Sequence, residues 1–418
     1  MDKIIISGNS KLFGSIKVNG SKNAALPILA ASLLSDKNLQ LTNLPDLVDI
    51  DNMKKLLIEY GVKINENNNL TICNAKNISN KIADYETVRK MRASILLLGP
   101  LLSRFKKATI SLPGGCAIGT RPIDIHLDAL KKLGVNINVD NGFVKAEIKD
   151  FLKGNNINLS FPSVGATENL LMSSIFAKGE TIINNAAREP EVVDLAKCLK
   201  SMGADIKGEG TNEIKIKGVL KLNESKHEII SDRIVAGTYI IAAVMLNSEF
   251  EVKNIKTEHI ESLTVLLKKM GANLIVNKDA IKILPSNNLK GTFIETAPYP
   301  GFPTDLQAQI MALMSIVKGN SEIIEKIFEN RFMHVSELNR LGANIKIHKE
   351  KAIITGSRNF KGAQVMASDL RASVSLVLAG LCASGTTTIN RVYHLDRGYE
   401  KIEETLGKCG PNIIREKN

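Results

Sequence analysis

Residues 130–137 read LKKLGVNI, and variants of this phrase recur along the whole chain. The variants are LLIEYGVKI at 56–64, LKSMGADI at 199–206, LLKKMGANL at 266–274, LNRLGANI at 338–345 and LGKCGPNI at 406–413. The glycines that they share are Gly61, Gly134, Gly203, Gly271, Gly342 and Gly410. Successive glycines lie about 70 residues apart, roughly one sixth of the chain, so the sequence predicts six copies of one structural repeat.

Each repeat is predicted to open with a short strand and to continue with an amphipathic helix, a hairpin and a second helix. The amphipathic helix ends at the shared glycine, a residue typical of the left-handed position after a helix. Apolar and polar residues alternate after five of these glycines, and Asn141-Gly142 within 135–148 predicts a tight hairpin turn. The opening strands are expected at 39–46, 108–115, 180–187, 249–256, 321–328 and 386–393.

The second helix of each repeat is apolar on nearly every side. These helices are expected at 23–34, 92–102, 165–177, 233–246, 305–317 and 369–383. A helix without a polar face is normally buried all round. The fold class is therefore predicted to be α/β, with six buried helices surrounded by strands, and only the charged or glycine-rich N-terminal ends of the helices are expected to meet water.

The two ends of the chain complete the repeats. The sixth repeat stops after one strand at 410–418, while the N-terminus supplies a spare strand, KIIISG, at 3–8. Pairing these strands predicts one domain of residues 1–21 with 231–418 and a second domain of residues 22–230. Two pseudo-symmetric halves joined by two crossings predict a cleft that closes on a ligand.

Composition narrows the classes of function. Lysine and arginine number 55 against 43 acidic residues, a net charge of +12 that favours an anionic partner. Aromatic residues make up only 4% with no tryptophan, which argues against a nucleic-acid binder that stacks bases. The five cysteines show no metal-binding spacing, and neither a leader segment nor a membrane span is recognisable, so we expect a cytoplasmic protein without a metal.

The glycine-rich stretch PGGCAIGTRP at 113–122 is the strongest candidate for chemistry. It places Cys116 near Arg121 and just before a helix, an environment that lowers the pKa of a thiol and makes it a usable acid, base or nucleophile. The other four cysteines, Cys73, Cys198, Cys382 and Cys409, are expected to be small buried residues.

Acidic and basic residues gather where helices begin. Thr304 and Gln307 fit a capping box around Asp305, which leaves that carboxylate available for other work. Asp232 and Asp369 are plausible N-caps. Cations near helix starts or in loops are Lys22, Arg92, Arg121, Arg233, Arg331, Arg371 and Arg397. His126 has no histidine partner at metal-binding spacing and is expected to play a structural or substrate-contacting role.

The chain resembles the enolpyruvyl transferase family, and in particular the members that act on UDP-N-acetylglucosamine at the first committed step of bacterial peptidoglycan synthesis. The resemblance rests on GSKNAALPIL at 20–29, RKMRAS at 89–94, LPGGCAIGTRPIDIH at 112–126, SVGAT at 163–167, NAAREPEVVD at 185–194, FPTDLQAQ at 302–309, IFENRFMHV at 327–335, DLRAS at 369–373 and HLDRGYE at 394–400. It implies two inside-out α/β barrels and transfer of the enolpyruvyl group of phosphoenolpyruvate to the 3′-hydroxyl of the sugar nucleotide. Neither a metal nor an organic cofactor is implied, and phosphate is released.

The resemblance also implies roles for residues around phosphoenolpyruvate. Cys116 would protonate the methylene carbon and could form an adduct with this substrate. Lys22 and Arg397 would hold its phosphate and carboxylate, with Asn23 at the reacting groups. Arg92 and Arg121 would stabilise anionic oxygens.

Other residues would meet UDP-N-acetylglucosamine. Asp305 would take the proton of the 3′-hydroxyl, and Asp369 would assist proton removal during elimination. The remaining contacts would come from Arg92, from Arg121, Pro122, Ile123, Asp124 and Ile125 on the uridine side, from Ser163, Val164 and Gly165 near the diphosphate, and from Ile327.

The sequence departs from many family members at Phe161, where they carry a lysine that reaches the diphosphate. The diphosphate role is therefore expected only for the backbone of Ser163 to Gly165. Three alternatives stay open: an enzyme acting on shikimate 3-phosphate, a non-catalytic copy that binds the sugar nucleotide, and a basic nucleic-acid binder.

Overall fold

The computed structural model describes residues 2–79, 92–112, 123–356 and 360–417. They form two compact units, each of which is described by itself. The terminal unit holds the described residues of 1–19 and 231–418, and the central unit holds the described residues of 20–230. Both units combine strands and helices in the same order, which confirms the predicted α/β class.

The amphipathic helices end at the shared glycines or within three residues before them, close to the prediction. α2 (Val48–Tyr60) and α9 (Glu261–Met270) stop directly at Gly61 and Gly271. All six shared glycines have φ between 92° and 119°, a left-handed conformation that residues with a side chain rarely adopt. The other helices of this class are α5 (Asp124–Lys132), α7 (Pro190–Ser201), α11 (Val335–Arg340) and α13 (Ile402–Gly407).

In the first five repeats the opening strand pairs antiparallel with the second strand of the hairpin that follows the glycine. The hairpin turn at Asn141-Gly142 has φ of 48° and 79°, the left-handed pair that a two-residue turn requires. The opening strands are β3 (Asn38–Thr42), β6 (Lys107–Ser111), β10 (Glu180–Asn184), β14 (Phe250–Lys253), β18 (Gly319–Ile324) and β22 (Thr386–Asn390). The hairpins are β4 (Lys63–Asn67) with β5 (Leu70–Asn74), β7 (Asn136–Asp140) with β8 (Phe143–Glu147), β11 (Asp205–Lys207) with β12 (Glu213–Lys217), β15 (Asn273–Val276) with β16 (Ala280–Leu284), and β19 (Ile345–His348) with β20 (Lys351–Gly356).

Among the described residues, five opening strands also have a short parallel neighbour. These neighbours have only three or four residues, too few for an alternating pattern to reveal them in the sequence. They are β2 (Ser15–Lys17) beside β14, β9 (Asn156–Asn158) beside β10, β13 (Ser225–Glu228) beside β3, β17 (Phe293–Glu295) beside β18, and β21 (Gln364–Met366) beside β22.

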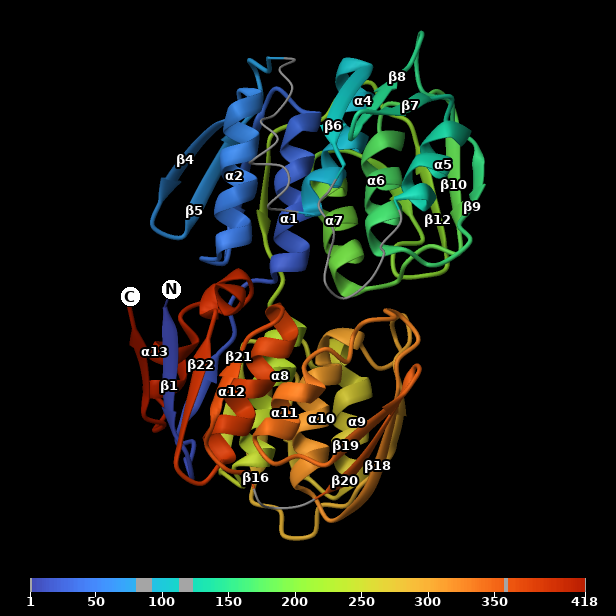
Figure 1. Cartoon of the computed structure of the whole chain (residues 1–418). Coiled ribbons are helices and arrows are strands. Elements are labelled where there is room, and N and C mark those ends of the chain that lie inside the picture. Colours follow the sequence, from blue (N-terminus) through green and yellow to red (C-terminus); the bar gives the residue numbers. More distant parts are fainter. Residues whose placement is uncertain (1, 80–91, 113–122, 357–359, 418) are drawn as a thin grey trace. The chain divides into compact units, whose positions relative to one another are not determined.

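The N-terminal strand completes the sixth repeat. β1 (Lys3–Ser7) lies antiparallel between β22 and β23 (Ile413–Glu416), with Lys3 opposite Glu416, so the two ends of the chain lie side by side (Figure 1). Ile4 and Ile6 point into the core and are fully buried. The predicted pairing of the two termini is therefore confirmed.

The second helices form the interior of each unit, with sheets outside them (Figure 1). In the central unit they are α1 (Lys22–Ala31), α4 (Leu98–Phe105) and α6 (Val164–Ser174), and in the terminal unit α8 (Arg233–Met245), α10 (Gln307–Ile316) and α12 (Leu370–Cys382). One difference from the prediction is that residues 92–97 form a 3₁₀ turn before α4. The 3₁₀ turns are η1 (Ser32–Leu34), η2 (Arg92–Leu97), η3 (Thr257–Ile260), η4 (Thr304–Leu306) and η5 (Val392–Arg397).

Candidate functional site

Lys22 opens α1 in the central unit and is itself buried. Ser21 caps the helix by accepting a hydrogen bond from the Ala24 N–H at 3.4 Å. The Lys22 ammonium lies 3.1 Å from a carboxylate oxygen of Asp49, in the first turn of α2, and only 8% of the residue is exposed. The expectation that charged helix ends meet water is therefore wrong here, because the paired carboxylate allows the cation to be buried. Asn23 follows directly and is half-buried.

The predicted diphosphate segment forms the N-terminus of α6. The Ser163 hydroxyl caps this helix and accepts a hydrogen bond from the Ala166 N–H at 3.3 Å. A side chain at Gly165 would lie 2.9 Å from Cε1 of His126, so glycine is required for α5 and α6 to approach one another. His126 is held by Asn169, with 2.9 Å between its Nδ1 and the amide nitrogen. This contact agrees with the structural role expected of His126.

Three further predicted residues stand at the start of α5. Ile123 occupies the N-cap position and Asp124 begins the helix, where its carboxylate accepts a hydrogen bond from the Ile125 N–H at 2.9 Å. The negative charge that the helix dipole favours at this end is thus supplied by Asp124 itself. Since α5 contacts α6 closely at His126, the structure brings both predicted sugar-nucleotide segments of the central unit together.

Asp305 lies in η4, immediately before α10 of the terminal unit. Its two carboxylate oxygens receive two guanidinium groups, Arg331 at 3.0 Å and Arg371 at 3.3 Å. Both arginines are buried, whereas 26% of the Asp305 side chain is exposed. The carboxylate is thus held from inside and keeps a solvent-facing side, an arrangement suited to accepting a proton from a bound hydroxyl.

The charge of Asp305 is also felt by Arg371. Burial by itself would lower the pKa of Arg371, but the attraction of Asp305, followed by that of Tyr399, outweighs burial and raises it. The predicted capping box at Thr304 is wrong. Pro303 occupies the N-cap position, and the Thr304 hydroxyl donates instead to the Glu325 carboxylate at 2.9 Å.

Asp369 is the N-cap of α12, as expected. Its carboxylate accepts hydrogen bonds from the N–H groups of Arg371 at 2.9 Å and Ala372 at 3.0 Å. His334 is close enough for its charge to be influenced by Asp369, but burial dominates and lowers the pKa of His334 to about 4. The imidazole is consequently neutral at physiological pH. Arg397 lies at the end of η5, and its charge adds to burial in lowering the pKa of His394.

Several predicted residues fall outside the described residues. They are Cys116, Arg121 and Pro122, together with the side chain of Arg92. Of the four described cysteines, Cys73, Cys198 and Cys409 are buried as expected, whereas Cys382 is half-buried. Burial raises the pKa of Cys73 and Cys382 to about 12, and it also raises the pKa of Cys198 and Cys409. These thiols stay protonated near neutral pH and are poor nucleophiles.

Two features in or near the predicted residues were not predicted from the sequence. The first is the pair of buried arginines that grip Asp305. The second is Glu168 in α6, which is buried and whose pKa is raised well above 4.5, first by burial and then by the neighbouring charges of Glu191 and Glu189. The only charged residue within the stretch at 165–177 is the signal that could have revealed it.

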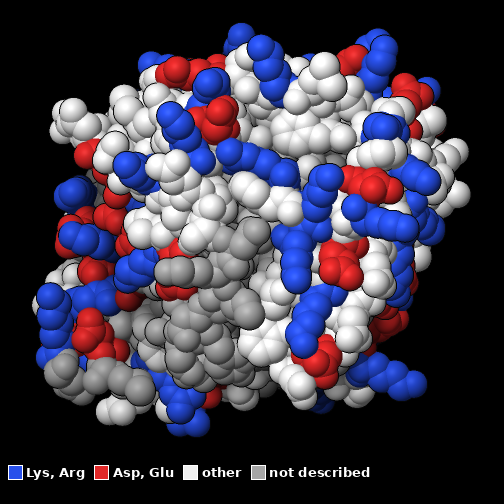
Figure 2. Space-filling model, turned by 90° about the horizontal axis from the view of Figure 1, so that it is seen from above, with Lys and Arg blue, Asp and Glu red and all other residues white. Residues whose placement is uncertain are grey.

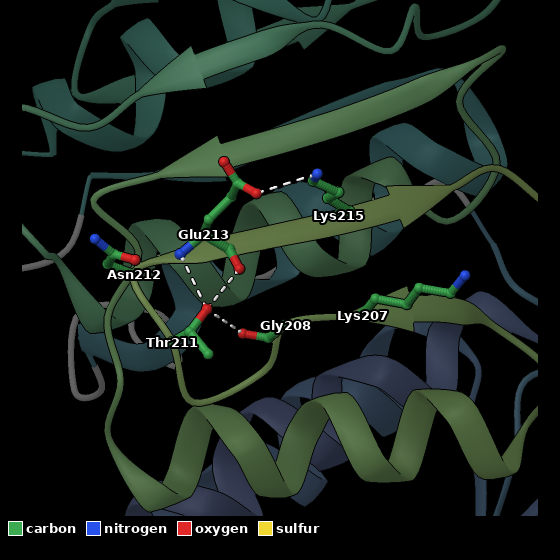
Figure 3. Close-up of a pocket in the computed structure, with 6 residues that line it drawn as sticks. All are labelled: Lys207, Gly208, Thr211, Asn212, Glu213 and Lys215. Carbon is green, nitrogen blue, oxygen red and sulfur yellow. Dashed lines mark hydrogen bonds and ion pairs between the residues drawn. The ribbon is translucent and has the colours of Figure 1, made fainter.

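A surface hollow of about 420 Å³ in the central unit is shown in Figure 3. It is lined by the β11–β12 region, and Thr211 closes the turn by donating to the carbonyl of Gly208 at 2.9 Å. Glu213 pairs with Lys215 at 3.2 Å. The lining consists of a hairpin turn and exposed lysines, and it contains none of the predicted site residues, so it carries no functional assignment.

Lysine and arginine side chains are numerous on the face in Figure 2. Several of them lie close together on the right of this view, with acidic side chains among them. Within the described ranges, no helix is both long and apolar enough to span a bilayer.

Comparisons with known proteins agree on one family. The family model of EPSP synthase (3-phosphoshikimate 1-carboxyvinyltransferase) matches residues 6–406. A UDP-N-acetylglucosamine 1-carboxyvinyltransferase of Paramagnetospirillum magneticum is 49% identical, covering 100% of this chain and 99% of the relative. One of the same name from Endomicrobium trichonymphae is 51% identical, covering 99% of each.

Solved structures reproduce the fold along the whole chain. The enolpyruvyl transferase NikO of Streptomyces tendae has a TM-score of 0.91 at 24% identity and covers 99% of this chain and 98% of its own. EPSP synthase of Acinetobacter baumannii has a TM-score of 0.78 at 19% identity with complete coverage of both chains. These likenesses confirm the predicted two-domain inside-out α/β fold.

Proposed function

This chain belongs to the EPSP synthase (3-phosphoshikimate 1-carboxyvinyltransferase) family, and on that premise we propose that it is a transferase of the enolpyruvyl (1-carboxyvinyl) group to the 3′-hydroxyl of UDP-N-acetylglucosamine. Phosphoenolpyruvate is the donor and phosphate is released. The observation that carries the proposal is the 49% to 51% identity, over essentially full length, to relatives that bear the name of this activity. The protein acts in the cytoplasm at the first committed step of peptidoglycan synthesis.

The donor is bound by cations. Lys22, Asn23, Arg121 and Arg397 hold phosphoenolpyruvate, whose phosphate and carboxylate suit charge-assisted hydrogen bonds. The acceptor is bound by Arg92, Arg121, Pro122, Ile123, Asp124, Ile125, Ser163, Val164, Gly165, Asp305 and Ile327. Support for the assignment comes from the close packing of α5 against α6 and from the helix N-terminus at Ser163, which favours anionic groups.

The reaction proceeds by addition and elimination. Asp305 removes the proton of the 3′-hydroxyl while the hydroxyl oxygen attacks C2 of phosphoenolpyruvate. The Cys116 thiol delivers a proton to C3. This step yields a tetrahedral intermediate that still carries the phosphate. Loss of a C3 proton, assisted by Asp369, then expels phosphate and leaves the enolpyruvyl ether.

The geometry of Asp305 supports its role as base. Its carboxylate is fixed by Arg331 and Arg371 on the buried side and is exposed on the other. A fixed base avoids the reorganisation that would otherwise slow proton transfer. Binding of both reactants where the two halves of the chain meet stays a prediction from the sequence.

Phosphate release is the decisive experiment. Purified protein should release phosphate from phosphoenolpyruvate only when UDP-N-acetylglucosamine is present, and Cys116→Ala should reduce the rate by about 10²- to 10⁴-fold, as expected for loss of a general acid. Cys116→Asp should retain much of the rate because a carboxyl group can also deliver the proton. Absence of phosphate release between about pH 6 and pH 9 would refute the proposal.

Two controls separate the alternatives. Turnover of shikimate 3-phosphate instead would assign the chain to the activity named by the family model. Binding of UDP-N-acetylglucosamine without turnover, measured by calorimetry, would indicate a non-catalytic copy. An epoxide phosphonate such as fosfomycin should modify Cys116 alone, because burial keeps the four described thiols protonated.

A further inference from the structure

Glu325 is a buried carboxylate directly after β18 in the terminal unit, and it binds four donors from three chain segments. One oxygen accepts hydrogen bonds from the Thr296 hydroxyl at 2.9 Å and from the N–H groups of Ile327 at 2.9 Å and Phe328 at 3.2 Å. The other oxygen accepts from the Thr304 hydroxyl at 2.9 Å. The function proposed above assigns Glu325 no role.

Together with an ion pair and the intervening backbone, these hydrogen bonds form a closed ring that passes through the proposed base, Asp305. Thr304 is followed at once by Asp305, and Asp305 is bound by Arg331 at 3.0 Å. The backbone N–H of Arg331 donates to the carbonyl of Phe328 at 3.3 Å, and the N–H of Phe328 returns to Glu325. Thr304, which precedes Asp305, and the segment that leads to Arg331 are therefore tied to one buried side chain, while Arg371 of α12 holds the other oxygen of Asp305.

The same carboxylate also shapes the proposed acceptor contact. The N–H groups of Ile327 and Phe328 both point at Glu325, which fixes the direction of this stretch of backbone. Lys326, which lies between Glu325 and Ile327, donates its backbone N–H to the Thr296 hydroxyl at 2.9 Å. The turn is therefore held at three successive N–H groups. A buried carboxylate that accepts several hydrogen bonds is rigid, since each lost bond leaves an unsatisfied group.

We infer that Glu325 is a positioning residue for the reaction, which sets both the proposed base Asp305 and the acceptor-binding backbone at Ile327. The inference rests on the proposed function. It predicts a combined kinetic effect, because the two tied segments act on different steps. Displacement of the base lowers kcat, and displacement of the turn at 327–328 raises KM for UDP-N-acetylglucosamine.

Glu325→Ala is the principal test. Loss of the ring should lower kcat by about 10- to 100-fold, the effect of shifting a reacting group by roughly an ångström. KM for UDP-N-acetylglucosamine should rise by about 5- to 10-fold, as expected for a lost buried hydrogen bond, while KM for phosphoenolpyruvate stays unchanged. A merely structural loss would reduce the active fraction and leave both KM values at those of the wild type.

Glu325→Gln should restore most of the activity. Its amide oxygen can accept the hydrogen bonds from Thr296, Ile327 and Phe328, and its amide nitrogen can donate to the Thr304 hydroxyl. Rescue by this isosteric variant would show that hydrogen bonding, and not the negative charge, is required. Should Glu325→Ala fail to fold, Thr304→Val breaks the ring on the Asp305 side alone and is expected to lower kcat without raising KM for the acceptor.

Ser321→Ala is the matched control on the same sheet. The Ser321 hydroxyl is buried in β18 and accepts a hydrogen bond from the Thr292 N–H at 3.2 Å, outside the ring. Its removal should lower the melting temperature by about 2 to 4 °C and leave kcat and both KM values unchanged. Wild-type kinetic constants in both Glu325→Ala and Thr304→Val would overturn the inference, whereas an inactive wild-type protein would overturn the proposed function instead.

Discussion

His334 gives the terminal unit a pH-dependent stability that can be calculated from the structure. Burial lowers the pKa of its imidazole from 6.5 to about 4, while Asp369 opposes the shift and Arg331 adds to it. Above pH 6.5 the ring is neutral in both the folded and the unfolded chain. As the pH falls from 6.5 towards 4, the unfolded chain binds a proton that the folded chain does not, so the free energy of unfolding decreases.

The size of the effect follows from proton linkage. At about 1.4 kcal/mol per pH unit, the full difference between the two pKa values is worth about 3 kcal/mol, and about 2 kcal/mol of it is already lost at pH 5. The replacement His334→Gln removes the titrating group and keeps a polar side chain. Wild type should therefore lose about 2 kcal/mol more than the variant between pH 7.5 and pH 5.

Urea unfolding followed by far-ultraviolet circular dichroism measures this difference, since the chain has no tryptophan for fluorescence. The two compact units can unfold in separate steps, so the step of the terminal unit is fitted by itself. His348→Gln is the control, because this histidine is exposed on β19. Equal losses of stability in wild type and His334→Gln would refute the reasoning.

Three further substitutions test the packing around the proposed site and the closure of the fold. Asp49→Asn removes the carboxylate beside the buried ammonium of Lys22; thermal unfolding should show a loss of about 3 kcal/mol, and KM for phosphoenolpyruvate should rise. Gly165→Ala places a methyl group 2.9 Å from His126, so the protein should lose about 1 to 3 kcal/mol and bind UDP-N-acetylglucosamine more weakly in calorimetry. Ile6→Asp buries a charge in β1 and should cost at least about 3 kcal/mol in urea unfolding.

Each of these has a matched replacement that should change little. Asp51→Asn alters the same first turn of α2 at a half-exposed side chain. Gly407→Ala adds a methyl group where no atom lies within 4 Å. Ile414→Asp changes β23 beside β1 at a residue that is 53% exposed. A loss in any control equal to that in its partner would contradict the packing argument for that position.

The repeat could be predicted because its signals are local. The conformation of a glycine after an amphipathic helix depends on its own φ and on no distant residue. All six shared glycines take the left-handed value that their position requires. Burial of the apolar helices could be predicted from their composition alone, because a helix without a polar face is stable only in the interior. Pairing of β1 with β23 followed from an arithmetic shortage of one strand in the sixth repeat.

The partners of the site residues could not be predicted in the same way. Arg331 and Arg371 reach Asp305 across 26 and 66 positions of sequence, and no pattern joins residues so far apart. At Thr304 a local pattern predicted a contact that the structure replaces with a more distant one. Its sequence fits a capping box, but the buried carboxylate of Glu325 lies within reach, and a charged acceptor forms the stronger hydrogen bond.

The position of the proposed chemistry follows from the architecture of the repeat. The ends of a buried helix are the parts that lie nearest to solvent, and in both units the predicted residues begin such helices: Lys22 at α1, Ser163 at α6, Asp305 ahead of α10 and Asp369 at α12. Those ends also offer backbone N–H groups and a positive dipole to anionic ligands. The repeats therefore place side chains at equivalent positions, the starts of the buried helices. A cation stands there in one repeat and a carboxylate in another, so the proposed substrate binding and proton transfer use the same scaffold.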